Sequence, residues 1–116
     1  MALRKFVERF TKPIADVDRE YLSEFAAARG GQALDTVKER SRVRAVGEVR
    51  AVRIVPRAGA PAVEAIISDG RGTVTAVFLG RRKIVGVSPG RRLAIEGMVA
   101  RNGTRLLIFN PQYELL

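Results

Sequence analysis

The chain has 116 residues, of which 47% are hydrophobic, so it can bury one modest core as a single domain. It contains no cysteine and no histidine, which excludes disulfides, thiolate chemistry and the imidazole groups of most hydrolase triads and zinc sites. The 21 Lys and Arg residues outnumber the 12 Asp and Glu residues, and the net charge of +9 attracts polyanions such as nucleic acid. We therefore expect a protein that is not an enzyme and has no cofactor and no metal.

The basic charge is concentrated in the C-terminal part of the chain. Residues 1–31 hold six basic and five acidic side chains, whereas residues 32–116 hold fifteen and seven, a net charge of +8. Most of the bases are arginines, which can donate in pairs to phosphate oxygens and can stack on nucleobases. Phosphate binding is one explanation of this bias, and codon usage in a GC-rich genome is the other.

The first 31 residues predict an N-terminal extension of two helices. Over residues 2–12, the apolar residues Leu3, Phe6, Val7 and Phe10 have helical spacing, and Pro13 ends the pattern. A second helix is expected with Asp16 or Asp18 as N-cap and with Gly30-Gly31 as its end. We expect the extension to pack on the rest of the domain or on a second copy of itself, with a linker near residues 30–33.

Signals for membrane insertion or export are missing from this chain. No apolar run has the length of a signal peptide, and none approaches the ~20 residues that a membrane-spanning helix needs. We therefore expect a cytoplasmic protein with no membrane partner.

The next segment predicts a long first strand and a loop. Residues 34–42 fit either a helical turn or the lead-in to a strand. Residues 42–54 alternate Arg with Val or Ala, and they predict a strand that bends at Gly47 and has a bulge near residues 50–51. Residues 56–61 begin and end with proline and predict a loop, because proline cannot donate to a ladder.

Residues 62–80 predict a β-hairpin around the turn Asp69-Gly70-Arg71-Gly72. Asp69 is expected to accept N–H groups of its own turn, and Glu64, Asp69 and Glu96 are too scattered to form an acid–base couple. Alternation gives one apolar face, with Val63, Ala65, Ile67, Val74, Ala76 and Phe78. The opposite face is mixed, with Glu64, Ile66, Ser68, Thr73, Thr75, Val77 and Leu79.

The remaining residues predict a second hairpin. The basic run Arg81-Arg82-Lys83 opens a connector that forms a short helix or a turn before Pro89-Gly90. A strand over residues 91–101, a two-residue turn at Asn102-Gly103 and a last strand over about residues 104–109 follow. Asn110-Pro111 is expected to stop regular pairing.

Five strands in this order match the OB-fold, a mainly β, five-stranded Greek-key barrel, here preceded by one or two N-terminal helices. The resemblance is carried by four segments: VRAVGEVRAVRIVPRAGAP, SDGRGTVTAVFLG, SPGRRLAIEGMVARNG and FNPQYEL. In order, they resemble the OB-type wedge domain of RecG helicases and the anticodon-binding-type OB domains. The chain is still more similar to small stand-alone OB-fold proteins of actinobacterial type. The resemblance covers residues 35–116, which we take as the OB-fold domain, and implies no helicase activity because the chain has no motor.

The resemblance implies binding on the face of the second and third strands and on the loops after the first and fourth strands. The corresponding residues are Arg50, Arg53, Arg57, Arg71, Thr75, Arg81, Arg82, Lys83, Arg101, Asn102, Arg105, Phe109 and Tyr113. Since few aromatic residues are available for stacking, we expect single-stranded DNA or RNA to be bound through its phosphates, with little sequence preference. The alternative is a protein-interaction or oligomerisation module that forms a homodimer or binds a protein partner through residues 3–26.

Overall fold

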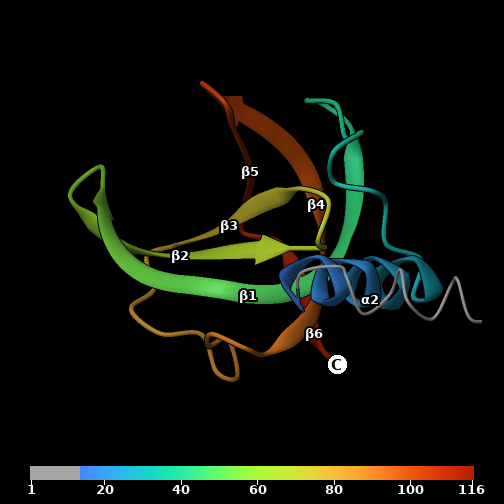
Figure 1. Cartoon of the computed structure of the whole chain (residues 1–116). Coiled ribbons are helices and arrows are strands. Elements are labelled where there is room, and N and C mark those ends of the chain that lie inside the picture. Colours follow the sequence, from blue (N-terminus) through green and yellow to red (C-terminus); the bar gives the residue numbers. More distant parts are fainter. Residues whose placement is uncertain (1–13) are drawn as a thin grey trace, which may run out of the picture.

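The computed structural model describes residues 14–116, so the helix predicted over residues 2–12 lies outside the described residues. The helix α2 (Ile14–Ala28) precedes the strands β1 (Arg42–Arg57), β2 (Ala60–Ser68), β3 (Thr73–Leu79), β4 (Arg92–Asn102), β5 (Arg105–Phe109) and β6 (Gln112–Leu115). The strands pair in the order β1-β2-β3-β5-β4-β6, and a further pairing of β1 with β4 closes the first five into a barrel (Figure 1). The pair β3–β5 is parallel and the other pairs are antiparallel. This topology confirms the predicted mainly β, OB-fold class.

Strand β1 serves two sides of the barrel because it changes partner halfway along its length. Residues 42–48 pair with β4, and residues 48–57 pair with β2. Gly47 lies next to this corner, where an added Cβ would sit 2.2 Å from the carbonyl oxygen of Ser68. The register with β2 shifts between Val49 and Ala51. The predicted bulge near residues 50–51 is therefore confirmed. Position 47 requires glycine because the backbone of Ser68 comes too close for a side chain.

The core of the barrel is the apolar face that the hairpin pattern predicts. Its members from β2 and β3 are no more than 6% exposed, namely Val63, Ala65, Ile67, Val74, Ala76 and Phe78. The connector over residues 80–91 forms turns, and its buried Ile84 and Val87 pack into the same core. Residues 34–41 also form turns, and Leu34 is buried.

Helix α2 covers the outer face of the first half of β1. Its Ala26 is buried against Val46 of β1 and Ala94 of β4, and Phe25 packs at the edge of this cluster. None of the helices in residues 14–116 is long and apolar enough to cross a membrane.

The two ends of α2 differ in how well the sequence predicts them. The helix begins at Ile14, so neither Asp16 nor Asp18 is its N-cap, and this expectation is wrong. Asp16 lies inside the first turn, where the helix dipole favours a carboxylate. An aspartate is therefore favourable at this position for a reason other than N-capping. The C-terminal end is as expected: Gly30 has a φ of 75°, and the N–H of Gly31 donates to the carbonyl oxygen of Ala26 at 2.9 Å.

The prediction that residues 56–61 form a loop is wrong, because most of these residues belong to β1 and β2. Only Ala58 and Gly59 form the turn, with φ values of 51° and 79°, and Pro56 lies opposite Pro61 in the ladder. The pair that flanks a two-residue turn exchanges hydrogen bonds, so the next pair, the two prolines, falls where the ladder needs no N–H. The result is a long β1–β2 ribbon whose tip projects from the barrel (Figure 1).

Pairing also resumes after Asn110-Pro111, contrary to the expectation that the last strand ends there. In β6, Gln112 lies opposite Glu96 and Leu115 opposite Leu93, on the side of β4 that β5 occupies further along. At Gly97, between the two paired parts, an added Cβ would sit 2.5 Å from Ile108. The two residues Asn110 and Pro111 therefore end β5, and the chain then pairs with β4 again as β6.

Candidate nucleic-acid interface

The outer face formed by the second half of β1 with β2, β3 and β5 lies between two turns, Ala58-Gly59 and Gly103-Thr104 (Figure 1). The second turn is one residue later than the predicted Asn102-Gly103, because Asn102 still pairs with Arg105. In register across it, Arg53 lies opposite Glu64, Glu64 opposite Val77, and Val77 opposite Phe109. We call this surface the open face. The side chains that define it are Arg53, Arg57, Glu64, Thr75, Val77, Arg105, Leu107 and Phe109.

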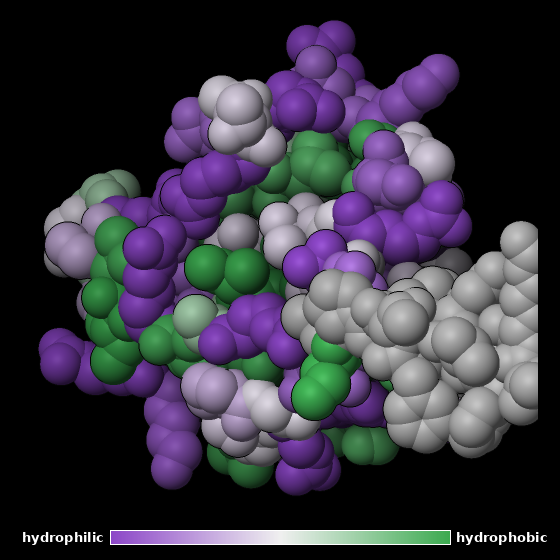
Figure 2. All heavy atoms as spheres, in the orientation of Figure 1, coloured by the Kyte–Doolittle hydropathy of each residue, from purple (hydrophilic) through white to green (hydrophobic). Residues whose placement is uncertain are grey.

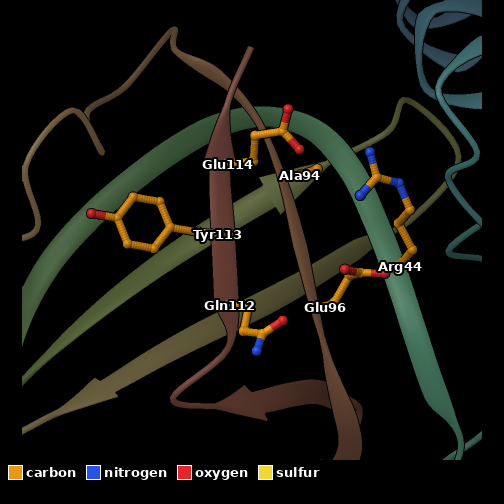
Figure 3. Close-up of a pocket in the computed structure, with 6 residues that line it drawn as sticks. All are labelled: Arg44, Ala94, Glu96, Gln112, Tyr113 and Glu114. Atoms are coloured by element: carbon orange, nitrogen blue, oxygen red, sulfur yellow. The ribbon is translucent and has the colours of Figure 1, made fainter.

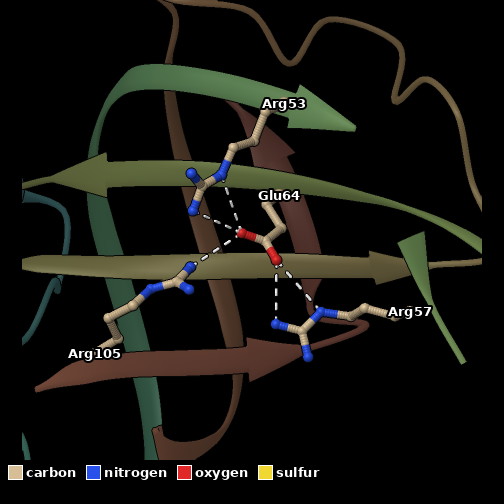
Figure 4. Close-up of polar contacts among 4 residues, drawn as sticks. All are labelled: Arg53, Arg57, Glu64 and Arg105. Carbon is tan, nitrogen blue, oxygen red and sulfur yellow. Dashed lines mark hydrogen bonds and ion pairs between the residues drawn. The ribbon is translucent and has the colours of Figure 1, made fainter. Parts of the chain in front are cut away.

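A buried carboxylate organises the basic residues of the open face. Glu64 is 1% exposed, and three arginines donate to it (Figure 4). Arg53 donates to its Oε1 through Nε at 3.3 Å and Nη2 at 3.2 Å. Arg57 donates to Oε2 through Nε at 3.3 Å and Nη2 at 3.1 Å, and Arg105 donates to Oε1 through Nη2 at 3.0 Å. We call these four residues the Arg–Glu cluster.

The Arg–Glu cluster keeps an excess of positive charge. Burial raises the pKa of Glu64, but the hydrogen bonds from Arg105, Arg57 and Arg53 outweigh this and hold the pKa below its usual value of 4.5. At neutral pH the cluster therefore carries three positive charges and one negative charge. Each guanidinium has five N–H donors and uses at most two on Glu64, so donors remain for an anion.

Apolar groups lie beside the cluster. Ala62, Val77 and Leu107 form a small buried group on the same side of the sheet. Phe109 is 41% exposed, and Cζ of Arg57 lies 5.5 Å from the centroid of its ring, within the range of a cation–π contact. Figure 2 shows hydrophilic side chains projecting around the molecule, with hydrophobic atoms visible between them. The open face thus combines cations with surface on which a base can stack.

Of the predicted site residues, the structure brings Arg53, Arg57, Thr75, Arg105 and Phe109 together on the open face. Thr75 is only 5% exposed and lies opposite Leu107, so it belongs to the floor of this surface rather than to its rim.

Two predicted residues lie at the β2–β3 turn. Arg50 and Arg71 line a hollow of about 360 Å³ together with Arg19 of α2, which the sequence did not single out. Each is also close to a carboxylate, since Nη1 of Arg50 is 3.4 Å from Glu48 and Nε of Arg71 is 3.4 Å from Asp35.

The remaining predicted residues lie on turns or away from the cluster. Arg81, Arg82 and Lys83 are exposed in the connector, which starts beside the ribbon because Gly80 donates to the carbonyl oxygen of Pro61 at 2.8 Å. Arg101 and Asn102 are exposed at the β4–β5 turn. Tyr113 is in β6, and its ring contacts the core residue Phe78 edge-on at 5.8 Å.

A second hollow, of about 210 Å³, lies on β1, β4 and β6, and its lining residues are Arg44, Ala94, Glu96, Gln112, Tyr113 and Glu114 (Figure 3). In Figure 3 the ring of Tyr113 points away from the side chains of Gln112 and Glu114. The two carboxylates beside a single arginine make this hollow a poor site for a polyanion. Across residues 14–116, no group of three or more His, Cys, Asp or Glu side chains is placed to hold a metal ion.

The β2–β3 turn has the role predicted for Asp69. The Asp69 carboxylate is 2% exposed and accepts the N–H groups of Arg71 and Gly72 at 2.8 and 2.9 Å. It also accepts the N–H of Leu34 at 2.9 Å, and Ser23 of α2 donates to the Asp69 carbonyl oxygen at 3.0 Å. The helix and the preceding turn therefore fix one end of the strands that carry the open face.

Glu64 is the residue at the centre of the candidate site that the sequence did not predict. The hairpin pattern placed it on the outer face, but as an isolated acid. A turn at Ala58-Gly59 sets Arg53 directly opposite Glu64, so assignment of that turn would have predicted the first ion pair. The contact with Arg105 depends on how β5 packs beside β3, which no local pattern predicts.

Comparisons with known proteins agree with the fold. No protein-family model matches the chain, and no curated protein matches it. Seven chains of solved structures match. One belongs to the crystal structure of the S. pombe Stn1-Ten1 complex, with a TM-score of 0.51 and 17% identity over 65% of this chain. The match spans 57% of that chain, and at this identity it shows a shared fold.

Proposed function

We propose that this chain is a non-enzymatic OB-fold module that binds nucleic acid at the open face. It prefers single-stranded DNA or RNA and makes phosphate contacts with little sequence preference. The observation that carries the proposal is the convergence of Arg53, Arg57 and Arg105 between two exposed turns, in a chain with a net charge of +9. Exposed guanidinium donors are suited to phosphate oxygens, and Phe109 offers one ring for a base.

The basic turns extend the same site. Arg101 and Asn102 flank the open face at the β4–β5 turn, and the run Arg81-Arg82-Lys83 begins beside the ribbon. We include Arg50 and Arg71 at the far end of the strands as further phosphate contacts. Tyr113 has the weakest support among the predicted residues, because its ring lies against Phe78.

Fluorescence anisotropy with labelled single-stranded DNA, duplex DNA and single-stranded RNA over a salt series tests the proposal. Five neutralised phosphates on a single strand give a slope of log K against log[salt] of about −3.5. Absence of binding to any single strand at low salt, or an affinity that does not change with salt, would contradict it.

A charge-matched pair of triple variants locates the site. Arg53, Arg57 and Arg105 changed to Gln should weaken binding to all sequences and reduce the salt slope by about 2 units. Arg40, Arg42 and Arg91 changed to Gln remove the same charge from exposed positions outside the open face, and should leave most of the affinity. Equal losses in the two variants would place the site elsewhere.

The interaction-module alternative has less support within residues 14–116. The buried face of α2, with Leu22 and Ala26 at 1% and 3% exposure, packs within the chain and is not available to a partner. Light scattering after size exclusion tests self-association directly, and a stable dimer together with no nucleic-acid binding would favour this alternative.

A further inference from the structure

Glu64 is an unusual residue for a surface that binds a polyanion. Its side chain is 2% exposed, it lies at the centre of the open face, and it neutralises one of the three arginine charges there. A buried ion pair costs desolvation and is often no more stabilising than apolar packing. A carboxylate at this position therefore needs a reason beyond stability.

Resting on the proposed function, we propose that Glu64 is a specificity-determining residue that keeps phosphate groups away from the centre of the open face. Single strands are selected because they can turn their bases toward the cluster and keep their phosphates at its edges. A ligand that can offer only phosphates to the centre, such as a duplex or a strand without bases, is disfavoured.

The geometry of the cluster supports this role. The three arginines approach the carboxylate at 3.0 to 3.3 Å, so their ring-like arrangement holds the guanidinium planes in place (Figure 4). A phosphate bound to the inner edges of these groups would lie within about two hydrogen-bond lengths of Glu64, close enough for repulsion. A neutral base meets no such repulsion, and it can stack on guanidinium planes or on Phe109.

The neighbouring groups favour bases as well. Phe109 is 41% exposed beside the cluster, whereas Val77 and Leu107 are buried beneath it at 0% and 2% exposure. A base can stack on the exposed ring of Phe109, and a phosphate gains nothing from that apolar surface. Both the charge at the centre and the surface beside it therefore select the same orientation of the strand.

Two ligands with equal backbone charge separate the contribution of the bases from that of the phosphates. They are a 12-nucleotide single strand and an abasic strand of the same length, both end-labelled. The wild-type protein should bind the abasic strand at least about tenfold more weakly, since one stacked base is worth ~1–3 kcal/mol. Glu64→Gln should strengthen binding of the abasic strand and of duplex DNA about fivefold, which corresponds to ~1 kcal/mol. Its binding of the normal single strand should change less than twofold.

Glu48→Gln is the matched control. Glu48 is in β1 and pairs with Arg50 at 3.4 Å, so this variant changes the net charge by the same unit without touching the cluster. Far-UV circular dichroism and melting of both variants verify that they are folded. If Glu64→Gln does not fold, equal wild-type affinity for the normal and abasic strands still overturns the proposal.

The outcomes are distinct. A narrowed gap between the normal and abasic strands in Glu64→Gln, but not in Glu48→Gln, supports the role of Glu64. Equal wild-type affinity for the two strands, or the same change in both variants, overturns it while leaving nucleic-acid binding intact. Absence of wild-type binding to both strands refutes the proposed function itself.

Discussion

The two halves of strand β1 differ in what lies on their outer face: α2 covers apolar residues of the first half, and the second half is charged and not covered by any described element. In the first half, Val46 and its neighbour Ala94 are small, apolar and covered by Ala26 of α2. In the second half, Arg53 and Arg57 take the outer positions around the buried Glu64, and no described element covers them. The first half gains stability from apolar burial. The second half places arginines around a buried carboxylate, where the desolvation cost offsets much of the gain from pairing but the charges suit a charged ligand.

Gly47 joins the two halves, and its substitution should have the largest effect. In Gly47→Ala the new methyl group meets the carbonyl oxygen of Ser68 at 2.2 Å, so the β1–β2 ladder must move. We expect a loss of about 3 kcal/mol in the free energy of unfolding, measured by urea denaturation.

Gly80→Ala is its control. The added methyl meets no atom within 4 Å, and only the positive φ of 71° is unfavourable, at about 1 kcal/mol. A Gly47→Ala protein as stable as Gly80→Ala would mean that the corner is not tightly packed.

Leu22→Ala tests the covered half. Leu22 is on the buried face of α2 and is 1% exposed, so its truncation should cost about 2–3 kcal/mol. Hydrogen-exchange protection should be lost in α2 before it is lost in the strands of the open face. Nucleic-acid affinity should be unchanged below the unfolding transition. Glu24→Ala, at an exposed position of the same helix, should have little effect on either quantity. A large loss of affinity in Leu22→Ala would show that the two halves are coupled.

Single arginines from the two halves sharpen the comparison of binding. Arg53→Gln should reduce the salt slope for a single strand by about 0.7, the contribution of one phosphate contact. Arg42→Gln, at an exposed position in the first half of the same strand, should leave the slope unchanged. Equal slopes in the two variants would assign the attraction to the overall charge of the protein.

The smallest effect concerns acid stability. The pKa of Glu64 is lower in the folded protein than its usual value of 4.5, so the unfolded chain binds more protons in acid. The stabilisation is complete above the usual value and is lost as the pH falls through the folded-state pKa. Urea denaturation at a series of pH values should show a weaker loss in Glu64→Gln. An unchanged pH dependence in that variant would mean that Glu64 titrates normally.

Local patterns predicted much of this fold. The hairpin over residues 62–80 and the Asp69 turn depend on residues close together in the chain, and the structure has both. The second hairpin is also present, but its two-residue turn is Gly103-Thr104 and not Asn102-Gly103, because Asn102 pairs with Arg105. The ribbon tip was missed because Pro56 and Pro61 are breakers only where a ladder needs their N–H groups, and register decides that. The strand β6 was missed because Asn110-Pro111 indicates the end of a strand, and because the pairing of β6 with β4 skips β5 in the sequence and is no local pattern.

The candidate site was less predictable than the fold. Arginines could be assigned to strands and turns, but their convergence on Glu64 combines the ribbon register with the parallel pairing of β5 and β3. The aromatic side chain of Tyr113 predicts a stacking residue, but its ring contacts Phe78, and this contact depends on the pairing of β6 with β4. The side chains of the open face come from β1, β2, β3 and β5, and they lie together only because these strands pair side by side in the barrel.

Pro56 of the ribbon also has a consequence for solubility. Beyond residue 49, β1 has β2 on one side only, so its other edge offers backbone groups to a strand of another molecule. At the non-hydrogen-bonded position 56 an N–H would point toward that edge, and Pro56 removes this donor. The proline that makes this part of β1 look like a loop in the sequence therefore helps to protect the ribbon from edge-to-edge aggregation.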